Sequence, residues 1–404
     1  RDTHYDKALK GLDWNAIGAD LRPRVASARS VGEVRALLTD LISRLGDSHY
    51  AIIPSEALAA PDSATTRKGD EFGDLGMDVR LLDGSIVVTR IDPAGAAAKA
   101  GVRTGWIVEQ VDSFAAATVA RGVVKSVRGG ERRVAGIHAA LAVTRRLGGA
   151  NGTPVRLVVR DERNRQIELV IVREPFIGDI VHLGSLPPIL ARLESQRIDD
   201  PDGCTGVIRF TSWMPVIAAQ FERAVRALRG CRGIILDLRG NLGGVAAMVM
   251  GTSGWFMSHA DTLGVLRMRD AELRYVAIPQ HASGDGRAAE PYAGALAILV
   301  DSHSASTSEM FAAGLQAAER ARVFGDTTAG QALPATLYRL PNRDVLMYAV
   351  ADFVTKKGVR LDGRGVIPDD VIPLRRTDLL AGRDLALQGA LRWVRNDRFT
   401  AHTR

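Results

Sequence analysis

The chain has 404 residues, of which 46% are hydrophobic and 25% are charged. These values are typical of a soluble globular protein, and the length predicts two or three domains. The net charge of +7 comes mainly from scattered arginines, and the absence of a basic stripe with aromatic residues argues against nucleic-acid binding. No apolar run approaches the roughly 18 residues needed to cross a bilayer. The chain begins at Arg1 rather than at Met, which fits the removal of a targeting segment.

The N-terminal part, residues 1–60, is predicted to be helical. Apolar residues recur at helical spacing between Val31 and Leu45. Gly46 is expected to end this helix, because glycine commonly follows a helix. Residues 61–71 are polar and turn-rich, and we interpret them as a linker.

Strand signals begin after this linker. Residues 76–80 and 85–91 alternate like strands around the hairpin signal Asp83-Gly84. A short alanine-rich helix follows at 96–100, and then comes the segment Gly105-Trp106-Ile107-Val108. With the closing strands, this pattern resembles a PDZ domain over residues 72–175. The resemblance implies that the loop with Gly73, Leu75, Gly76 and Met77 binds a peptide C-terminus by strand addition. A domain that only packs or regulates is the alternative.

From residue 176 to residue 404, buried strand-like runs alternate with helical ones, which predicts a layered α/β core. The last helix is expected over residues 378–394. Cys204 and Cys231 each precede a strand-like run, at 205–210 and 232–238. If these strands are neighbours, the two sulfurs lie at one end of the sheet and can form a disulfide, which would favour an oxidising compartment. Two reduced, partly buried thiols are an equally open alternative.

Two turns in this core have the features of an acyl-transfer site. The serine-rich run 304–309 follows the apolar strand 295–300 and opens a helix expected at 310–320. A hydroxyl there would lie at a helix N-terminus, where backbone N–H groups point outward, although serine is also an ordinary N-cap residue. After the strand 234–238, Gly243 and Gly244 leave backbone N–H groups unshielded, as an oxyanion hole requires.

The runs 234–244, 304–309, 325–330 and 363–369 together closely resemble the C-terminal processing, or tail-specific, serine peptidases. The resemblance covers essentially the whole chain, and it implies a layered α/β core of the ClpP/crotonase kind. It also implies that Ser306 is the nucleophile. The backbone N–H of Thr307 would then join Gly243 or Gly244 around the oxyanion.

The chain departs from this family at the general base. Bacterial members commonly carry a lysine about 25 residues after the serine, and here that position is Gln331, which cannot accept a proton. His49 is the best replacement, because its ordinary pKa lies near neutral pH. The tricorn-core branch of the family has a Ser-His pair before its PDZ domain and an acid before the Gly-Val-x-Pro-Asp motif. By this resemblance, Ser48 and Asp362 would orient His49.

Each of these residues has a plainer interpretation. His49 could cap a helix C-terminus, and Asp362-Gly363 is an ordinary turn signal. His303, three residues before Ser306, is an unfavourable candidate because a residue so close in sequence rarely faces the nucleophile. Metal-ligand spacings such as His-x-x-x-His are absent, so no metal and no other cofactor are expected.

The sequence therefore predicts a serine endopeptidase that acts on peptides or unfolded protein C-termini. The family is usually exported, so a periplasmic or extracellular location is expected, and a homo-oligomer is left open. The alternative, motivated by Gln331, is a catalytically inactive PDZ protein that binds peptides or acts as a scaffold. A crotonase-type acyl-CoA enzyme is a third interpretation, against which the PDZ-like segment and the serine-rich helix start argue.

Overall fold

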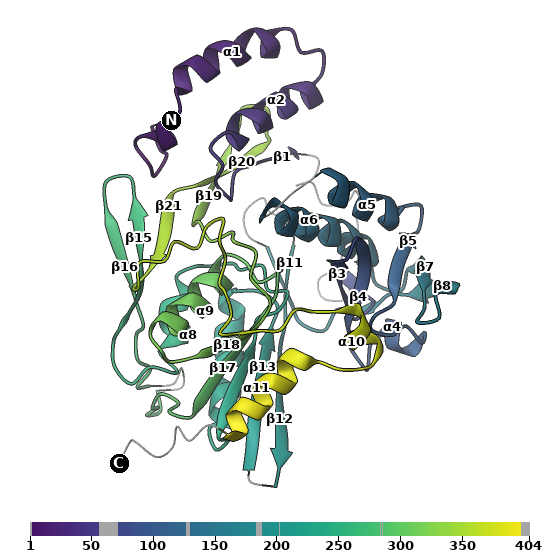
Figure 1. Ribbon diagram of the computed structural model, residues 1–404, viewed down its shortest axis with the longest axis vertical. Helices are drawn as coiled ribbons and strands as arrows, with labels where there is room; N and C mark the ends of the chain where they lie inside the picture. Colours follow the sequence, from purple (N-terminus) through teal and green to yellow (C-terminus); the bar gives the residue numbers. More distant parts are fainter. Residues whose placement is uncertain are drawn as a thin grey trace.

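The computed structural model describes residues 2–55, 72–126, 130–182, 188–201, 203–282, 284 and 286–396. Figure 1 shows three parts: a pair of helices at the top, a blue unit on the right, and a central teal and green core. The predicted linker 61–71 lies outside the described residues. No described helix is both long and apolar enough to span a bilayer.

The core is built on a six-stranded sheet with the order β12-β13-β14-β17-β18-β22. Strands β13 to β22 run parallel, and β12 is an antiparallel edge strand. The strands are β12 (Leu193–Asp200), β13 (Gly203–Phe210), β14 (Gly233–Asp237), β17 (Ala295–Val300), β18 (Arg322–Gly325) and β22 (Asp370–Val371).

Helices cover both faces of this sheet, which explains why β14 and β17 are buried at every residue. Successive side chains point to opposite faces. Ile234 joins the large cluster that contains Phe311 of α9, whereas Ile235 packs with Ala390 of α11 on the other face. The layered α/β core is thus confirmed. Its helical segments are η2 (Pro215–Ile217), α7 (Ala218–Ala227), α8 (Met248–Ser253), α9 (Thr307–Ala317), α10 (Arg376–Leu380) and α11 (Leu385–Asn396).

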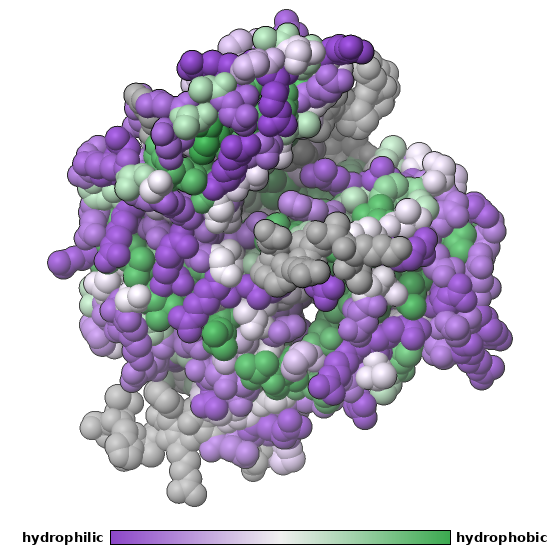
Figure 2. All heavy atoms as spheres, turned by 45° about the horizontal axis from the view of Figure 1, so that its top comes forward, coloured by the Kyte–Doolittle hydropathy of each residue, from purple (hydrophilic) through white to green (hydrophobic). Residues whose placement is uncertain are grey.

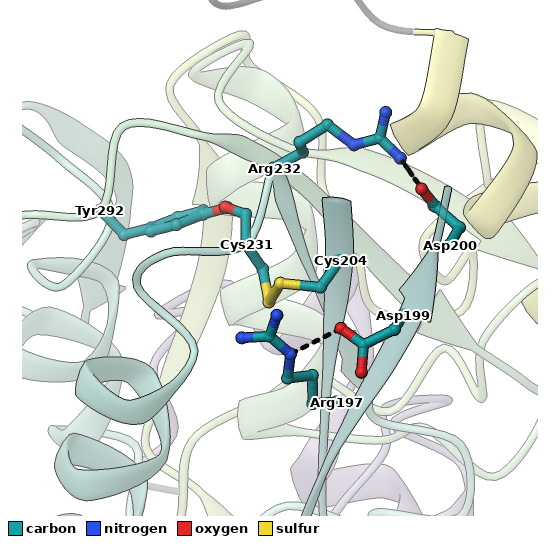
Figure 3. Close-up of a disulfide and its surroundings, with 7 residues drawn as sticks. All are labelled: Arg197, Asp199, Asp200, Cys204, Cys231, Arg232 and Tyr292. Atoms are coloured by element: carbon teal, nitrogen blue, oxygen red, sulfur yellow. Dashed lines mark hydrogen bonds and ion pairs between the residues drawn. A yellow bond between two sulfur atoms is a disulfide. The ribbon is translucent and has the colours of Figure 1, made fainter. Parts of the chain in front are cut away.

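A disulfide joins Cys204 and Cys231 at one end of this sheet (Figure 3). It forms because β13 and β14 are parallel neighbours, with Thr205 opposite Gly233. Both cysteines are buried, and the hydroxyl of Tyr292 donates a hydrogen bond to the carbonyl of Cys231 at 2.7 Å. The structure therefore selects the disulfide over the two free thiols.

Residues 72–175, which we call the inserted unit, form a five-stranded antiparallel sheet with the order β3-β4-β5-β7-β8. Its strands are β3 (Met77–Leu82), β4 (Ser85–Ile91), β5 (Ile107–Val111), β7 (Pro154–Arg160) and β8 (Gln166–Val172). Its helices are α4 (Ala96–Lys99), α5 (Ala116–Ser126) and α6 (Gly130–Leu147). A smaller sheet of order β6-β2-β9 closes the unit, and consists of β2 (Phe72–Asp74), β6 (Gly149–Ala150) and β9 (Glu174–Pro175).

The N-terminal part contains η1 (Leu9–Gly11), α1 (Trp14–Ala26) and α2 (Val31–Ser43). The Ser30 hydroxyl accepts the Glu33 N–H and caps α2. Below these helices in Figure 1 lies a three-stranded sheet of order β1-β20-β19, with β1 (Ala51–Ile53), β19 (Ala335–Arg339) and β20 (Val345–Ala349). The helical prediction for residues 1–60 fails after Ser43, because residues 51–53 pair with β20 and form a strand instead.

Two further small sheets complete the fold. They are formed by β15 (Thr262–Met268), β16 (Glu272–Val276) and β21 (Ala351–Thr355), and by β10 (Asp179–Val181) and β11 (Ile189–Ala191). Figure 2 shows the face that carries the N-terminal helices, which is mainly hydrophilic and hollowed between those helices and the inserted unit.

Two helix boundaries differ from the predictions. Helix α9 begins at Thr307, three residues before the expected start, because Ser306 is its N-cap. The expected helix 378–394 is divided into α10 and α11, and Gly382, with a φ of 65°, lies between them.

Charged pairs dock the inserted unit onto the core. Arg80 of β3 lies 3.0 Å from Asp301, which follows β17, and Arg209 of β13 lies 2.6 Å from Asp78. An apolar contact accompanies them: Ile137 of α6 packs with Ala305 and Ala329 of the core. The inserted unit therefore touches the turn that carries Ser306.

Candidate active site

Ser306 lies at the N-terminus of α9 in a strained backbone conformation. Its φ is 55° and its ψ is −118°, a region that non-glycine residues rarely adopt. The first turn of α9 is closed by the Ser306 backbone carbonyl, which accepts the N–H of Glu309 at 2.8 Å, and the Glu309 carboxylate accepts the Ser306 N–H in return, as in a capping box. The Ser306 side chain is half-buried.

The glycine turn lies directly against this serine. A side chain at Gly243 would place its Cβ 2.7 Å from the Ser306 Cβ, so only glycine fits there. The Gly243 N–H donates to the Asn241 side chain at 3.0 Å and is therefore occupied. Within the described residues, no hydrogen bond from the backbone N–H of Gly244 or Thr307 is present, and the Thr307 hydroxyl bonds the Gly244 carbonyl at 2.9 Å. Of the two glycines, Gly244 is thus the one with a free amide.

The buried carboxylate of Glu309 accepts hydrogen bonds from the turn that carries Ser306. Glu309 accepts the backbone N–H groups of Ser306 at 3.1 Å, Gly330 at 2.7 Å and Gln331 at 2.8 Å. Burial raises the pKa of Glu309 to about 7, although these hydrogen bonds favour its ionised form. Glu309 thereby ties the loop at 328–331 to the serine. Sequence analysis did not single out this role, although the Ser-x-x-Glu spacing was visible.

Gln331 contacts the serine through its backbone. Its carbonyl accepts the Ser306 N–H at 2.8 Å. The loop at 328–331 thus lies beside Ser306, and residue 331 has an amide side chain. The Gln331 amide cannot act as a base.

His49 and Asp362 are joined through Ser48. The Ser48 hydroxyl lies 2.8 Å from His49 Nδ1, and the Ser48 backbone N–H donates to Asp362 Oδ2 at 3.3 Å. Burial lowers the pKa of His49 to about 4, so the imidazole is neutral at pH 7. His49 is not a helix cap, because α2 already ends at Ser43. Its backbone φ of 60° is again left-handed.

The segment that contains Asp362 lies beside the loop that contacts Ser306. The Gly363 N–H donates to the Gly330 carbonyl at 2.8 Å, one residue before Gln331. Asp362 is only 7% exposed, its Oδ1 has no partner within the described residues, and burial raises its pKa while the Ser48 hydrogen bonds lower it. A continuous set of hydrogen bonds and chain neighbours therefore runs from Ser306 to His49.

Arg360 links Asp47, which precedes Ser48, to Asp362. This residue was not identified from the sequence. Arg360 Nη2 lies 3.2 Å from Asp47 Oδ1 and 3.5 Å from Asp362 Oδ2, and its Nε donates to Asp352 at 2.6 Å. Asp47 precedes Ser48 in the chain and also accepts the hydroxyl of Tyr5 at 2.9 Å. No local pattern marks Arg360 as a link to Asp47, because these two residues lie far apart in the chain.

The other predicted residues lie elsewhere. His303 is buried beside Asp301 at the junction with the inserted unit, where burial lowers its pKa to about 3. In the predicted peptide-binding loop, Gly73 lies on β2, Leu75 and Met77 are buried, and the Gly76 N–H donates to the Asp74 carboxylate at 3.0 Å. Among the described residues, no group of three or more His, Cys, Asp or Glu side chains could hold a metal ion.

Comparisons with known proteins find similar peptidases. Residues 204–372 match peptidase family S41. A carboxy-terminal-processing protease of Bartonella bacilliformis is 25% identical over 350 residues, which cover 84% of this chain and 70% of that protein. The carboxy-terminal processing protease CtpA of Bacillus subtilis is 23% identical over 369 residues, covering 91% of this chain and 68% of that protein.

Solved structures share the fold across nearly the whole chain. The photosystem II D1 C-terminal processing protease has a TM-score of 0.58 at 21% identity, covering 98% of this chain and 94% of that one. Mature CPAF has a TM-score of 0.58 at 13% identity, covering 95% and 90%. At these identities the likeness describes the fold alone.

The layered core and the matched segment together define a serine peptidase. The match to peptidase family S41 covers residues 204–372, and the similar proteins are C-terminal processing proteases. The predicted resemblance to C-terminal processing serine peptidases is thereby confirmed, whereas the tricorn-like branch stays a prediction.

Proposed function

We propose that this peptidase cleaves peptide bonds with Ser306 as the nucleophile and His49 as the general base. The observation that carries the proposal is the strained Ser306 beside the free amides of Gly244 and Thr307. Support for the base comes from the Ser48 hydroxyl, which lies 2.8 Å from His49 Nδ1 and leaves Nε2 for the proton transfer.

In the proposed reaction, the Ser306 hydroxyl oxygen bonds to the carbonyl carbon of the scissile peptide, and its proton passes to His49 Nε2. The oxyanion is stabilised by the N–H groups of Gly244 and Thr307. When the C–N bond breaks, His49 returns the proton to the leaving amine. Water then hydrolyses the acyl-enzyme by the same route. Asp362, acting through Ser48, orients the imidazole as in the tricorn-like arrangement.

The inserted unit is proposed to be a PDZ domain that binds the C-termini of peptide or unfolded protein substrates. Its edge strand β3 and helix α6 are in contact, as the two walls of a PDZ groove would be. The Gly76 N–H would have to exchange Asp74 for the peptide carboxylate. By analogy with the named activity of the relatives, the substrates would be proteins that are processed near their C-termini.

An exported location is supported by the disulfide, because disulfides persist in oxidising compartments. Mass spectrometry of the protein, alkylated during extraction from its native source, tests this proposal. A disulfide-linked peptide pair containing Cys204 and Cys231 is expected, and alkylated free cysteines would contradict export.

A fluorophosphonate probe tests the chemistry directly. We expect wild-type protein to be labelled at Ser306, and Ser306→Ala and His49→Ala to remain unlabelled while folded by circular dichroism. If His49→Ala is labelled at the wild-type rate, the base has been misassigned. If folded wild-type protein is neither labelled nor able to cleave β-casein, the second candidate applies: an inactive peptide-binding protein, which Gln331 in place of lysine favours.

A further inference from the structure

Strand β19 is exposed along its whole length. All five residues from Ala335 to Arg339 are exposed, and the side chains of Leu337 and Tyr338, on opposite faces, are 38% and 60% exposed. Its only ladder partner within the described part of the chain is β20. Exposed edges of this kind are usually protected in monomeric proteins, because their free backbone groups bind other strands.

The register shows which backbone groups are free. The Val350 N–H donates to the Pro334 carbonyl at 2.9 Å, and the Leu340 N–H donates to the Asp344 carbonyl at 2.8 Å. Hydrogen-bonded positions alternate in an antiparallel pair, so the backbone of Ala335, Leu337 and Arg339 faces away from β20. No hydrogen bond from the described residues reaches these outward N–H and C=O groups.

This edge is continuous with the candidate active site. The segment that leads into β19 starts at Gln331, whose carbonyl accepts the Ser306 N–H, and it passes through the buried Ala332 and Leu333. On the other side of β20, β1 begins at Ala51, two residues after His49. The three-stranded sheet thus connects the segments that carry the proposed base and the loop beside the nucleophile.

We propose that the free edge of β19 is a substrate-docking strand, on which an extended segment of an unfolded polypeptide adds as a further strand. The proposal rests on the proposed peptidase function and extends it to the substrate's backbone. Ala335 lies four positions after Gln331, about 13 Å at the rise of an extended chain. The docked residues therefore lie about four or more positions from the scissile bond, and the docking is largely independent of sequence.

A second copy of the chain is the competing occupant. A five-residue edge is far smaller than the roughly 800 Å² per partner of a standard stable interface, so it does not sustain a dimer by itself. A substrate segment needs no such area, because the proposed active site holds the same polypeptide at a second point.

Proline substitutions test the edge, because they remove an outward N–H without removing a bond to β20. Leu337→Pro and Arg339→Pro are the test variants. Arg274→Pro is the matched control: β16 is another exposed edge strand, and the bond from Met268 N–H to Ala271 O places the Arg274 N–H outward. Circular dichroism and thermal unfolding establish that each variant is folded.

Binding is measured in the Ser306→Ala background, so that it does not depend on hydrolysis. The probe is a fluorescein-labelled β-casein segment of about twenty residues, amidated at its C-terminus so that it carries no carboxylate for the inserted unit. By fluorescence anisotropy we expect Leu337→Pro and Arg339→Pro to weaken binding about tenfold, and Arg274→Pro to bind as the parent does. Folded proline variants of β19 with parental affinity would overturn the proposal.

Activity and assembly provide the second readout. In the active protein, we expect Leu337→Pro to lower the ratio of kcat/KM for the long peptide to kcat/KM for a tetrapeptide ester about tenfold. If light scattering instead shows a wild-type dimer that Leu337→Pro dissociates, the edge binds a second copy and the proposal is wrong. If the wild type cleaves nothing while the β19 variants still lose binding, docking stands and the peptidase mechanism fails.

Discussion

At the scale of single residues, backbone strain and burial prepare the proposed catalytic groups. Ser306 and His49 both have positive φ values, 55° and 60°. Such conformations cost of order 1–3 kcal/mol each and persist only where surrounding contacts enforce them. At Ser306 the enforcing contacts are the hydrogen bonds of its N–H to Gln331 and Glu309. At His49, burial keeps the imidazole neutral.

The pH dependence of labelling follows from His49. Its pKa is lowered to about 4, so the neutral base is fully present at pH 6 and above. We expect the rate of fluorophosphonate labelling to be flat from about pH 6 to pH 8 and to fall as pH drops through about 4. The same shift destabilises the fold between about pH 6.5 and pH 4, because the unfolded histidine binds a proton first. An inflection of labelling near pH 6.5 would contradict the burial of His49.

Gly243 provides a steric test of the nucleophile turn. In Gly243→Ala the new Cβ meets the Ser306 Cβ at 2.7 Å, at a backbone φ of 101° that alanine rarely adopts. We expect labelling to fall at least about 100-fold, the size of effect seen when an oxyanion site is disturbed. Gly251→Ala is the control, because nothing lies within 4 Å of its Cβ in α8. Equal labelling of both variants would show that the turn at Gly243 is not part of the active site.

At the scale of elements, the candidate site is assembled from segments that share no strand or helix. The serine belongs to the start of α9, the histidine precedes β1, and Asp362 lies in the loop between β21 and β22. Backbone hydrogen bonds such as Gly363 N–H to Gly330 O hold these loops together. Arg360 adds a charged link between the segments of Asp47 and Asp362.

Removing this link should affect the rate more than the binding of substrate. In Arg360→Met, Asp47 and Asp362 lose their common cation, and we expect kcat to fall about tenfold with KM changed less than about twofold. Arg360→Lys should recover part of the rate, because its charge remains. Arg267→Met, which breaks an exposed pair with Glu272, is the control. An unchanged kcat in folded Arg360→Met would show that backbone contacts alone hold the segments of Asp47 and Asp362 in place.

At the scale of the whole molecule, the inserted unit and the core meet at charges that also support the active-site turns. Asp301 accepts Arg80 of the inserted unit at 3.0 Å and the Gly240 N–H of the glycine turn at 3.0 Å. On the other side of the junction, Arg133 of α6 donates to the Arg364 carbonyl at 3.1 Å. The inserted unit is thus linked through Asp301 to the glycine turn at Gly240, and it contacts the loop at Arg364 directly.

Loss of the Arg80 side chain should therefore destabilise the protein. Arg80→Met leaves the buried carboxylate of Asp301 without its cation, which costs about 3 kcal/mol in comparable buried pairs. Chemical denaturation measures this free energy of unfolding. Arg156→Met is the control, because its pair with Glu168 is exposed to solvent and should contribute little to stability. Equal losses in the two variants would mean that the junction does not contribute.

Much of this architecture was predictable from local patterns. The strand 85–91 was predicted at its observed boundaries, and the apolar run 295–300 predicted β17, because alternation and apolar runs report burial directly. The cysteine spacing before two strands suggested the disulfide that the structure contains. The boundaries of α9 and of the C-terminal helices were less accurate, because a cap and one glycine decided them.

The sequence by itself determined the order of the elements, the resemblance to C-terminal processing peptidases and the presence of Gln331, which cannot act as a base, since each of these is written in consecutive residues. Only the tertiary structure decided that the Gly243 amide is occupied by Asn241, that Arg360 joins Asp47 to Asp362, and that β19 has a free edge. The link from Arg360 to Asp47 is a contact between residues far apart in the chain, whereas the occupied Gly243 amide and the free edge of β19 depend on the direction in which backbone groups point. Neither kind of property leaves a periodic trace in the sequence.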